Sequence, residues 1–392
     1  MNIPFLDLVS QHRDLKDELL DICDKAISSA SFIGGSMVSN FENEFAKFCG
    51  VKYCIAVNSG TDALRFAYIA AGIKPGDLVV TVPNTFIATT ESISQTGASP
   101  VFIDIDEKTY TIDVSKLREY LTTQCQWKNG KLFDKSRNRP VTAVVPVHLY
   151  GQCADMDLIE EIGREFNLLI FEDACQAHGA QYFSKASNSW KSAGSMGIAN
   201  AFSFYPGKNL GACGEGGAIT TNNENIAQTA RMLRDHGQAQ KYFHDFEGYN
   251  GRLDAIQCGI LSVKLSSLPI WNDKRRTAAE YYNDLLKSVP DIITPFEHGW
   301  SKAVYHLYVI RTENRNNLQK KLNDNGIATG LHYPVPLHLQ KAYINCGFTK
   351  GDFPTAEMYA EKILSLPIYP SITKEQQEYV VKAISESVYS FN

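Results

Sequence analysis

One stretch, Ser203 to Gly217, combines a single lysine with a cluster of glycines; its sequence is Ser-Phe-Tyr-Pro-Gly-Lys-Asn-Leu-Gly-Ala-Cys-Gly-Glu-Gly-Gly. A short apolar run at 199–204 leads into a Pro-Gly corner that presents Lys208, and four glycines follow between Gly211 and Gly217. Glycine allows positive φ and the close approach of another group. A lysine at such a corner either contacts an anion or forms an imine; a plain hairpin with a solvated lysine is the alternative.

Two common glycine motifs do not fit this stretch. In the Walker phosphate loop, G-x-x-x-x-G-K, the first glycine would fall at Phe202. The dinucleotide-binding fingerprint has a different spacing, since the glycines here follow G-x-x-G-x-G-G. The partners of Lys208 must therefore be sought elsewhere in the chain.

A candidate phosphate site lies at residues 58–64, directly after a predicted strand at 53–57. Ser59, Gly60 and Thr61 occupy the tight turn where the next helix begins. The N–H groups and the positive dipole end of a helix start attract phosphate. Simple capping of the helix by Ser59 or Thr61 is the alternative.

A candidate carboxylate lies where the buried strand at 168–171 ends in Glu172 and Asp173. Alternation along a strand places the two on opposite faces, so at most one faces a site at the strand end. Such a carboxylate can keep a pyridinium nitrogen protonated, although Asp173 could instead cap a helix. Gln176 and His178 follow, and a single histidine is more often structural than catalytic.

Together, these residues predict pyridoxal phosphate as the cofactor. Lys208 supplies an amine for an imine, Asp173 an anion for the ring nitrogen, and residues 59–61 a phosphate seat. Phe86, which follows Pro-Asn-Thr at a strand end, offers a flat apolar face against which the ring could stack. Each feature is common by itself, and the prediction depends on their order along one chain.

Strands and helices alternate through the first 250 residues, which predicts an α/β fold with a largely parallel central sheet. The predicted strands are 53–57, 78–82, 100–104, 141–147, 168–171, 199–204 and 218–221, and the predicted helices are 6–27, 39–48, 85–96 and 155–166. The second helix is expected to begin with a capping box at Ser39–Glu42. The polar stretch 122–140 is expected to be a surface insertion or hairpin.

The pattern changes near Arg252, so we expect two domains. Residues 1–250 are predicted to form a large cofactor-binding α/β domain and residues 251–392 a small C-terminal α+β domain, onto which the N-terminal helix could pack. The expected elements of the small domain are helices at 253–265, 269–289, 314–325, 354–364 and 374–387 and a strand at 304–311.

The composition is typical of a soluble globular protein, with 44% hydrophobic and 21% charged residues among 392. A net charge of −5 provides no basic surface for nucleic acid. No apolar run is long enough to span a bilayer, and the charged N-terminus does not resemble a signal peptide. Nine cysteines without a C-x-x-C pair argue against disulfides and structural zinc, so we expect no metal and a cytoplasmic location.

The motifs together resemble the DegT–StrS group of nucleotide-sugar aminotransferases, which are fold type I pyridoxal-phosphate enzymes. The resemblance extends from Pro-Phe-Leu-Asp-Leu at 4–8 to Leu-Ser-Leu-Pro-Ile at 364–368. It implies that Lys208 forms the imine with the cofactor and later moves protons between the cofactor and the substrate carbon. The cofactor-binding residues that it implies are Gly60, Thr61, Asp173, Gln176, Ser203, Lys208 and Asn250, in addition to Phe86 from the residue pattern above.

The resemblance also assigns a role to each of these positions. It places Asp173 at the pyridine nitrogen, Gln176 near the ring hydroxyl, and residues 60, 61 and 203 around the phosphate. In this family an asparagine from the partner subunit completes the phosphate site, and Gly-Tyr-Asn-Gly-Arg-Leu-Asp at 248–254 matches its motif at Asn250. The resemblance therefore implies a homodimer with active sites at the interface.

Two further segments resemble particular members of the family. The sequences at 206–211 and 147–152 are similar to those of members that aminate C3 of dTDP-linked 3-keto-6-deoxyhexoses, whereas members that act at C4 tend to carry Thr-Thr-Gly-Glu-Gly-Gly after the lysine. The segment His-Tyr-Pro-Val-Pro-Leu-His at 332–338 is similar to the sugar-binding loop, which places His332 and Tyr333 near the hexose. Its two prolines exclude a helical metal pair of His332 and His338; a rigid surface loop is the alternative.

The implied reaction transfers an amino group from L-glutamate to C3 of the keto sugar and yields a dTDP-3-amino-3,6-dideoxyhexose and 2-oxoglutarate. This activity belongs to deoxyamino-sugar biosynthesis for lipopolysaccharide or another glycan. Some family members replace the lysine with histidine and act as dehydratases, so Lys208 favours transamination. Glu215, where many relatives carry aspartate, is a mild departure.

Four alternatives stand beside this hypothesis. The enzyme could aminate a UDP-linked 3-keto sugar such as an N-acetylated uronate, for which extra cationic groups are expected, or it could act at C4. A non-catalytic regulator on the same fold would be expected to lose Lys208 or Asp173, and both are present. A nicotinamide-dependent oxidoreductase is disfavoured because the glycine fingerprint is missing.

Overall fold

A nine-stranded mixed sheet forms the centre of the structure, a computed structural model that describes residues 1–389. Its main path is β1–β11–β10–β7–β6–β2–β3. The strands are β1 (Tyr53–Val57), β2 (Leu78–Thr81), β3 (Ser99–Phe102), β6 (Arg139–Val144), β7 (Leu169–Asp173), β10 (Ala199–Ser203) and β11 (Gly217–Thr221). Strands β10, β7, β6, β2 and β3 are parallel, and β11 is antiparallel to both of its neighbours. The predicted α/β fold is confirmed.

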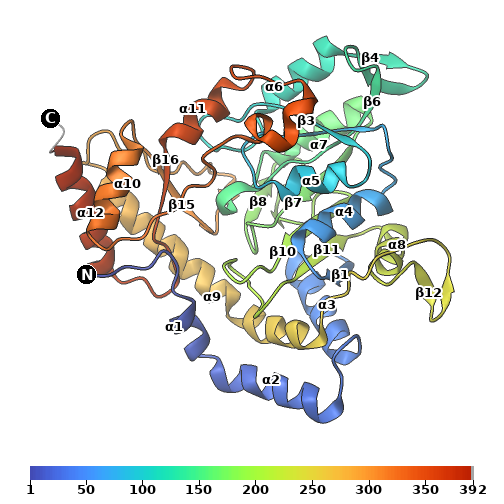
Figure 1. Ribbon diagram of the computed structural model, residues 1–392, viewed down its shortest axis with the longest axis horizontal. Helices are drawn as coiled ribbons and strands as arrows, with labels where there is room; N and C mark the ends of the chain where they lie inside the picture. Colours follow the sequence, from blue (N-terminus) through green and yellow to red (C-terminus); the bar gives the residue numbers. More distant parts are fainter. Residues whose placement is uncertain (390–392) are drawn as a thin grey trace.

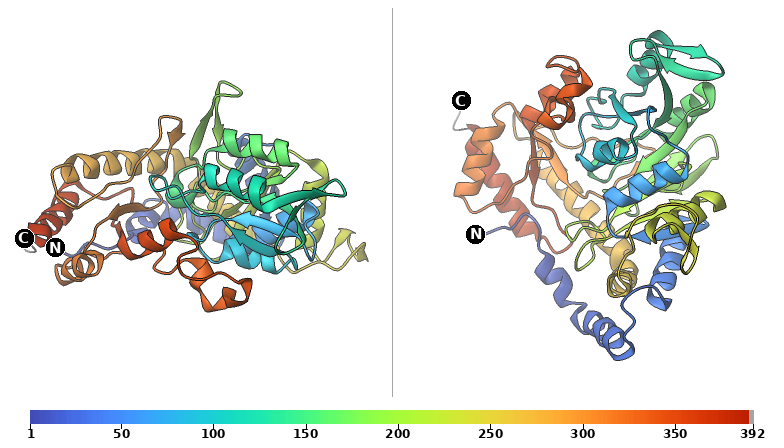
Figure 2. Two further views of the ribbon diagram at one scale, coloured as in Figure 1. Left: turned by 90° about the horizontal axis from the view of Figure 1, so that it is seen from above. Right: turned by 45° about the vertical axis from the view of Figure 1, so that its right-hand side comes forward.

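Helices cover both faces of this sheet (Figures 1 and 2). Alternation along β1 shows the division, since Ile55 and Val57 pack on one face and Cys54 and Ala56 on the other. The first face is covered by α4 (Gly60–Ala70), α5 (Ala88–Ser94) and α8 (Glu224–Arg234), and the second by α3 (Ser36–Cys49), α7 (Met156–Phe166) and the first half of α9 (Ala255–Leu286). Burial on both faces explains why these strands appear as continuous apolar runs in the sequence.

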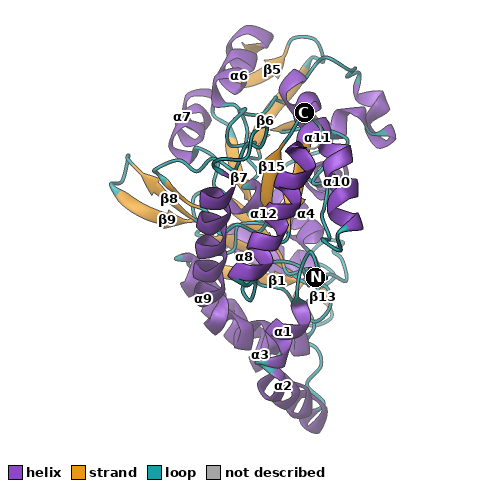
Figure 3. Ribbon diagram, turned by 90° about the vertical axis from the view of Figure 1, so that its left-hand side faces the viewer, coloured by secondary structure: helices purple, strands orange, loops and turns teal. Residues whose placement is uncertain are grey.

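The C-terminal part of the chain has its own small sheet and core. Strand β15 (Tyr308–Arg311) pairs antiparallel with β16 (Ile363–Leu366), and α10 (Arg315–Asp324) and α12 (Lys374–Tyr389) pack beside them (Figure 3). Helix α9 connects this part to the large sheet (Figure 1). Ile3 joins the same core, because its N–H donates to the oxygen of Gly326 at 2.8 Å and its oxygen accepts from Ala328 at 3.0 Å. The domain boundary at residue 250 stays a prediction.

Three helix predictions are wrong in detail because tertiary packing overrides local pattern. The expected helix at 6–27 is two helices, α1 (Leu8–Arg13) and α2 (Lys16–Ser29). The expected capping box is absent, since α3 begins at Ser36 and the hydroxyl of Ser39 donates within the helix to the Ser36 oxygen at 3.1 Å. The helices expected at 253–265 and 269–289 are one helix, α9, which contains Pro269 and buries the flanking Leu268 and Asn272.

Smaller elements lie outside the main path of the large sheet. The polar stretch 122–140 contains the predicted hairpin, β4 (Cys125–Lys128) and β5 (Lys131–Asp134), and β5 pairs antiparallel with the first residues of β6. A second hairpin, β12 (Gln238–Gln240) and β13 (Phe243–His244), projects from the body at the end opposite the termini (Figures 1 and 2). The remaining elements include β8 (Gln181–Ser184), β9 (Ser189–Ser192), β14 (Ser301–Lys302), α6 (Val114–Glu119) and α11 (Pro354–Lys362). No helix among residues 1–389 is both long and apolar enough to cross a membrane.

Asp104, just after β3, ties the large sheet to the C-terminal part, and its removal should destabilise the fold. Its carboxylate accepts hydrogen bonds from the N–H groups of Thr355 at 3.0 Å and Ala356 at 2.9 Å, in the first turn of α11, and from Lys116 Nζ at 3.0 Å. Asp104→Ala should lower the free energy of unfolding by about 2–3 kcal/mol, because buried donors lose their acceptor. Urea unfolding would measure this; the exposed Glu119→Ala is the control, and equal stability of both variants would contradict the prediction.

Candidate active site

A cavity of about 630 Å³ lies at the carboxyl ends of the parallel strands, where α/β folds bind ligands. It collects residues that follow β2, β6, β7 and β10 together with segments from both ends of the chain. The predicted site residues that line it are Gly60, Thr61, Phe86, Asp173, Gln176, Ser203, Lys208, His332 and Tyr333. The structure therefore brings together every predicted site residue except Asn250.

The candidate phosphate seat forms where the start of α4 meets the end of β10. Ser59 is the N-cap of α4, and its hydroxyl accepts from the N–H of Asp62 at 3.1 Å. A Cβ atom on Gly60 would lie 2.6 Å from Cβ of Ser203, so only glycine allows this close approach. The first N–H groups of a helix have no partner within it, so those of α4 at Gly60 and Thr61 can bind an anion in the cavity. The seat fits a phosphate group.

Lys208 projects into the cavity from a tight corner between β10 and β11. The corner is closed by hydrogen bonds from Lys208 N to the Tyr205 oxygen at 2.9 Å and from Ala212 N to the Phe204 oxygen at 2.7 Å. Lys208 is half-buried in the cavity wall, which excludes the solvated hairpin lysine. Removal of the amine from water lowers the pKa of Lys208, although Cys175 and Asp173 act in the opposite direction. A lowered pKa favours the neutral, nucleophilic amine.

Asp173 faces the cavity and is held by a short relay of hydroxyl groups. Its Oδ2 accepts from Thr89 Oγ1 at 2.7 Å, and Oδ1 accepts from the N–H of Cys175 at 3.2 Å. Because a carboxylate can only accept, the Thr89 hydroxyl directs its hydrogen to Asp173 and accepts in turn from Thr85 Oγ1 at 2.9 Å. Both threonines are buried, and neither was among the predicted site residues.

Glu172 points to the opposite side of β7, as the alternation along the strand predicted. Its carboxylate accepts from the N–H groups of Gly194, Met196 and Gly197 at 2.5–2.7 Å and from Nε2 of His148 at 2.8 Å. With its oxygens fully engaged away from the cavity, Glu172 supports the loop after β9. Asp173 is therefore the carboxylate available to a ligand.

Gln176 connects the floor of the cavity to the predicted sugar-binding loop. Its Oε1 accepts from the N–H of Tyr150 at 2.7 Å, which fixes the orientation of the amide. Its Nε2 donates to the hydroxyl of Tyr333 at 3.1 Å, and the hydroxyl of Tyr150 donates to the oxygen of His332. The second hydrogen of Nε2 stays available for a ring hydroxyl, the role predicted for Gln176.

Two histidines, His306 and His332, line the same cavity as Lys208. His332 stacks on Phe5 with ring centroids 5.7 Å apart, and its Nδ1 lies 2.8 Å from Ser365 Oγ. Burial and the charge of Lys208 lower the pKa of His332 to about 4 and that of His306 well below its usual value. Both rings are therefore neutral. His306 was not predicted, because a single histidine before a strand carries no recognisable motif.

The other histidines singled out from the sequence lie elsewhere. His338 does not line the cavity and pairs with Glu357, Nε2 to Oε1, at 2.9 Å. His178 does not line the cavity; it packs between Phe202 and Phe204, and burial lowers its pKa to about 3. Its structural interpretation fits this position.

Asn250 lies outside the cavity, on the exposed segment that follows the β12–β13 hairpin. Its side-chain oxygen accepts from Nη2 of Arg252 at 2.7 Å. A residue so placed cannot contact the cavity of its own chain, as expected if it serves another copy. Its predicted role depends on a partner subunit.

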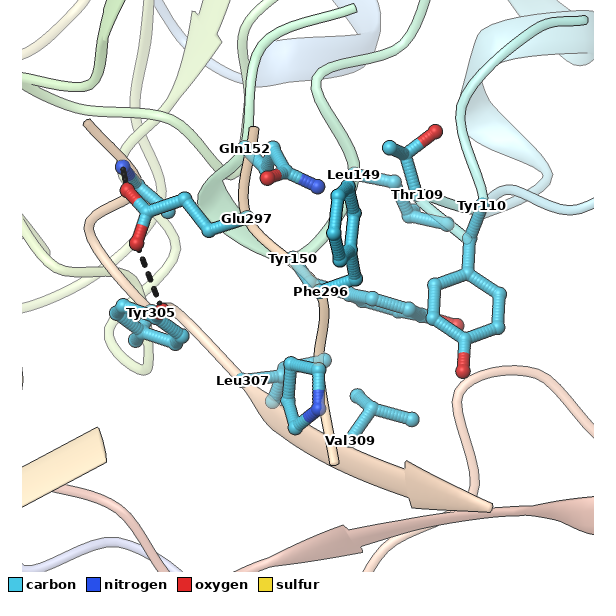
Figure 4. A pocket seen from close by; sticks show the side chains of 12 residues that line it. Thr109, Tyr110, Leu149, Tyr150, Gln152, Phe296, Glu297, Tyr305, Leu307 and Val309 are labelled. Carbon is cyan, nitrogen blue, oxygen red and sulfur yellow. Dashed lines mark hydrogen bonds between the residues drawn. The ribbon is translucent and has the colours of Figure 1, made fainter. Parts of the chain in front are cut away.

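A second, much smaller cavity of about 30 Å³ lies behind Leu307, which lines both cavities (Figure 4). Glu297 accepts there from the hydroxyl of Tyr305 at 2.9 Å. The buried Oε1 of Gln152 has no hydrogen-bond partner among residues 1–389, and the volume suits one ordered water. This cavity is too small for a substrate and belongs to the packing around the site.

The donor set of the large cavity fits pyridoxal phosphate. A half-buried lysine, a fixed carboxylate at a strand end, a helix start and the exposed ring of Phe86 surround one space. Such a site on a doubly covered, mainly parallel sheet defines the class of fold type I pyridoxal-phosphate enzymes.

Comparison with known proteins identifies the family. Residues 13–385 match the DegT/DnrJ/EryC1/StrS aminotransferase family, and the chain belongs to it. The dTDP-3-amino-3,6-dideoxy-alpha-D-galactopyranose transaminase of Aneurinibacillus thermoaerophilus is 41% identical over 99% of this chain and all of that protein. A pleiotropic regulatory protein of Geobacillus stearothermophilus is 42% identical over 98% of both chains. A UDP-N-acetyl-3-dehydro-alpha-D-glucosamine 3-aminotransferase of Acidithiobacillus ferrooxidans is 36% identical over 99% of this chain and 98% of that one.

The fold agrees with this assignment. The crystal structure of Streptomyces venezuelae DesV in complex with a ketimine intermediate matches with a TM-score of 0.90 and 38% identity over 98% of both chains. The chain is therefore a pyridoxal-phosphate-dependent aminotransferase, and the predicted family, enzyme class and cofactor are confirmed.

Loss of the Thr89 hydroxyl should weaken cofactor binding. Thr89→Val keeps the shape of the side chain but leaves Asp173 without its shortest hydrogen bond, so pyridoxal phosphate should bind about tenfold more weakly. Fluorescence titration of the apoprotein measures this, and Thr89→Ser should restore binding. Thr90→Val, which removes a neighbouring buried hydroxyl that donates to the Ile87 oxygen at 3.0 Å and not to Asp173, is the control. Unchanged affinity of Thr89→Val would refute the relay.

Proposed function

We propose that the enzyme transfers an amino group from L-glutamate to C3 of a dTDP-linked 3-keto-6-deoxyhexose. The products are a dTDP-3-amino-3,6-dideoxyhexose and 2-oxoglutarate. The observation on which this depends is that Lys208 shares one cavity with His332 and Tyr333 of the loop predicted to bind the sugar. The names of the relatives from Aneurinibacillus thermoaerophilus and Streptomyces venezuelae support the C3 position and the dTDP group.

The residues of the chain have separate tasks in this reaction. Pyridoxal phosphate, when bound, supplies the electron sink for both half-reactions. Asp173, oriented by Thr89, would hold the ring nitrogen, and Phe86 would stack on the ring. The amine of Lys208 removes the proton from the α-carbon of glutamate and later delivers a proton to C3 of the sugar. Its lowered pKa suits both directions of transfer.

The cavity wall favours a neutral sugar over a uronate. Among the described residues that line it, the only lysine is Lys208 and there is no arginine. A carboxylate at C6 would therefore lose water without gaining a cation in this wall. The apolar side chains of Phe5, Leu6 and Leu307 suit a methyl group instead. A UDP-linked 3-keto sugar, as in the name of the Acidithiobacillus relative, is the alternative substrate.

A homodimer with shared active sites is part of the proposal. Asn250 is exposed and lies next to a projecting hairpin, whose Tyr242 and Phe243 are 78% and 66% exposed. Large exposed aromatic side chains are typical of interfaces. We place the enzyme in the cytoplasm, where nucleotide-linked sugars are used as soluble substrates.

The absorbance of the bound cofactor tests the reaction directly. Glutamate should bleach the visible band of the holoenzyme, and dTDP-3-keto-6-deoxyglucose should restore it, as a two-step transfer requires. Lys208→Ala should lower turnover at least about 1,000-fold through loss of the proton-transferring amine. Recovery of the band only with a UDP-linked 3-keto sugar would move the substrate to the alternative. If neither sugar restores the band, the substrate assignment fails.

Co-expression of two inactive variants tests the shared site. Asn250→Asp places a carboxylate beside the phosphate, so this variant and Lys208→Ala should each be nearly inactive. Hybrid dimers would regain one intact site, and a random mixture should recover about a quarter of the wild-type activity. Lys208→Ala with Asp173→Ala is the control, because both residues line the cavity of one chain and no intact site can form. Recovery in the control alone, or in neither mixture, would contradict the role of Asn250.

A further inference from the structure

Lys264 is a buried cation without a carboxylate partner. It lies on α9, is only 1% exposed and forms no ion pair with a carboxylate within residues 1–389. Buried charges are usually paired with an opposite charge, so this position is unusual. The Nζ atom donates to the backbone oxygen of Gly211 and lies 3.2 Å from Nε2 of His12. Burial lowers the pKa of Lys264 to about 8.

The hydrogen bonds of His12 fix the tautomer of its neutral ring. Nδ1 lies 2.6 Å from the oxygen of Leu8, which can only accept, so Nδ1 carries the hydrogen. In the neutral ring Nε2 then presents a lone pair, which accepts from Lys264. A proton on Nε2 would remove this acceptor and place the positive charges of His12 and Lys264 next to each other. Burial and the charge of Lys264 accordingly lower the pKa of His12.

The hydrogen bond from Lys264 to Gly211 holds the corner that carries Lys208. Gly211 lies against the start of the corner, since a Cβ atom there would be 2.4 Å from the oxygen of Pro206. The next residue closes the corner through the bond from Ala212 N to the Phe204 oxygen at 2.7 Å. Lys264 therefore anchors the corner at its base, from the side away from the cavity.

The hydrogen bond from Lys264 to His12 holds residues 1–13, here called the N-terminal arm. Phe5 and Leu6 of the arm form part of the cavity wall, and Phe5 stacks on His332. The arm is tied to the C-terminal part at Ile3 by backbone hydrogen bonds, and to α9 at His12. Phe5 and Leu6 therefore lie between the two points, Ile3 and His12, at which the arm is attached to the rest of the structure.

We propose that Lys264 is a positioning residue that latches the N-terminal arm to the Lys208 corner and thereby sets the width of the cavity on its sugar side. A single ammonium group joins the wall at Phe5 and Leu6 to the loop that presents the reactive amine. The latch works only while His12 is neutral, because its Nε2 must accept. This inference goes beyond the reaction proposed above, although its kinetic readout depends on that reaction.

His12→Phe tests the latch without touching a residue that lines the cavity. The variant breaks the bond to Lys264 but leaves the bond from Lys264 to Gly211. Amide hydrogen exchange of residues 3–12 should become about tenfold faster, while that of β7 and β10 stays unchanged. The KM for the keto sugar should rise about five- to tenfold with little change in kcat, because the wall moves and the chemistry stays.

Two further variants separate positioning from simple stability. His12→Gln keeps an oxygen that can accept from Lys264 and should restore the wild-type exchange rate and KM. Lys264→Met removes the cation, and adding His12→Phe to it should cause no further change, since the two residues share one interaction. Wild-type exchange and KM in His12→Phe, or failure of His12→Gln to restore them, would overturn the latch. If the wild-type enzyme does not use the keto sugar, hydrogen exchange still decides the question.

Discussion

The pairing of Ser203 with Gly217 across β10 and β11 is the constraint on which the active site depends. It fixes both ends of the corner that carries Lys208. The same two residues receive the start of α4: Gly60 lies against Ser203, and a Cβ atom on Gly217 would be only 2.3 Å from the oxygen of Ser59. Two glycines thus place a helix start, a strand end and Lys208 around one small space. Side chains at either position would separate the phosphate seat from the amine.

Much of the fold could be predicted from the sequence because its main features depend on neighbouring residues. The apolar runs of β1, β2, β6 and β7 and the strand-turn-helix at 53–64 are local patterns, and the structure contains them. The wrong helix predictions concern features that depend on residues far apart in the chain. The break between α1 and α2 and the continuity of α9 through Pro269 are set by packing between distant elements, which no local pattern records.

The candidate site shows the same difference between features set by neighbouring residues and features set by distant contacts. Asp173 and Glu172 could be assigned to opposite sides because strand alternation is a local rule. Thr89 and Lys264 could not be assigned from the sequence. Each is an ordinary residue on a helix whose role comes from one partner far along the chain: Thr89 is 84 residues from Asp173, and Lys264 is 252 from His12. Only the three-dimensional contact distinguishes them from solvated side chains of the same type.

The charges around the cavity favour Lys208 as the residue that moves protons. His306 and His332 line the wall, but burial and the charge of Lys208 lower the pKa of both, so neither ring carries a proton to donate as a cation near neutral pH. Asp173 is engaged by Thr89 and Cys175, and Glu172 faces away. The two other strong bases buried nearby are engaged outside the cavity: Lys264 donates to the Gly211 oxygen and to Nε2 of His12, and Arg275 donates to backbone oxygens. Among the described residues that line the cavity, Lys208 is the only lysine and there is no arginine, so its amine is the group best suited to transfer a proton between two carbon atoms.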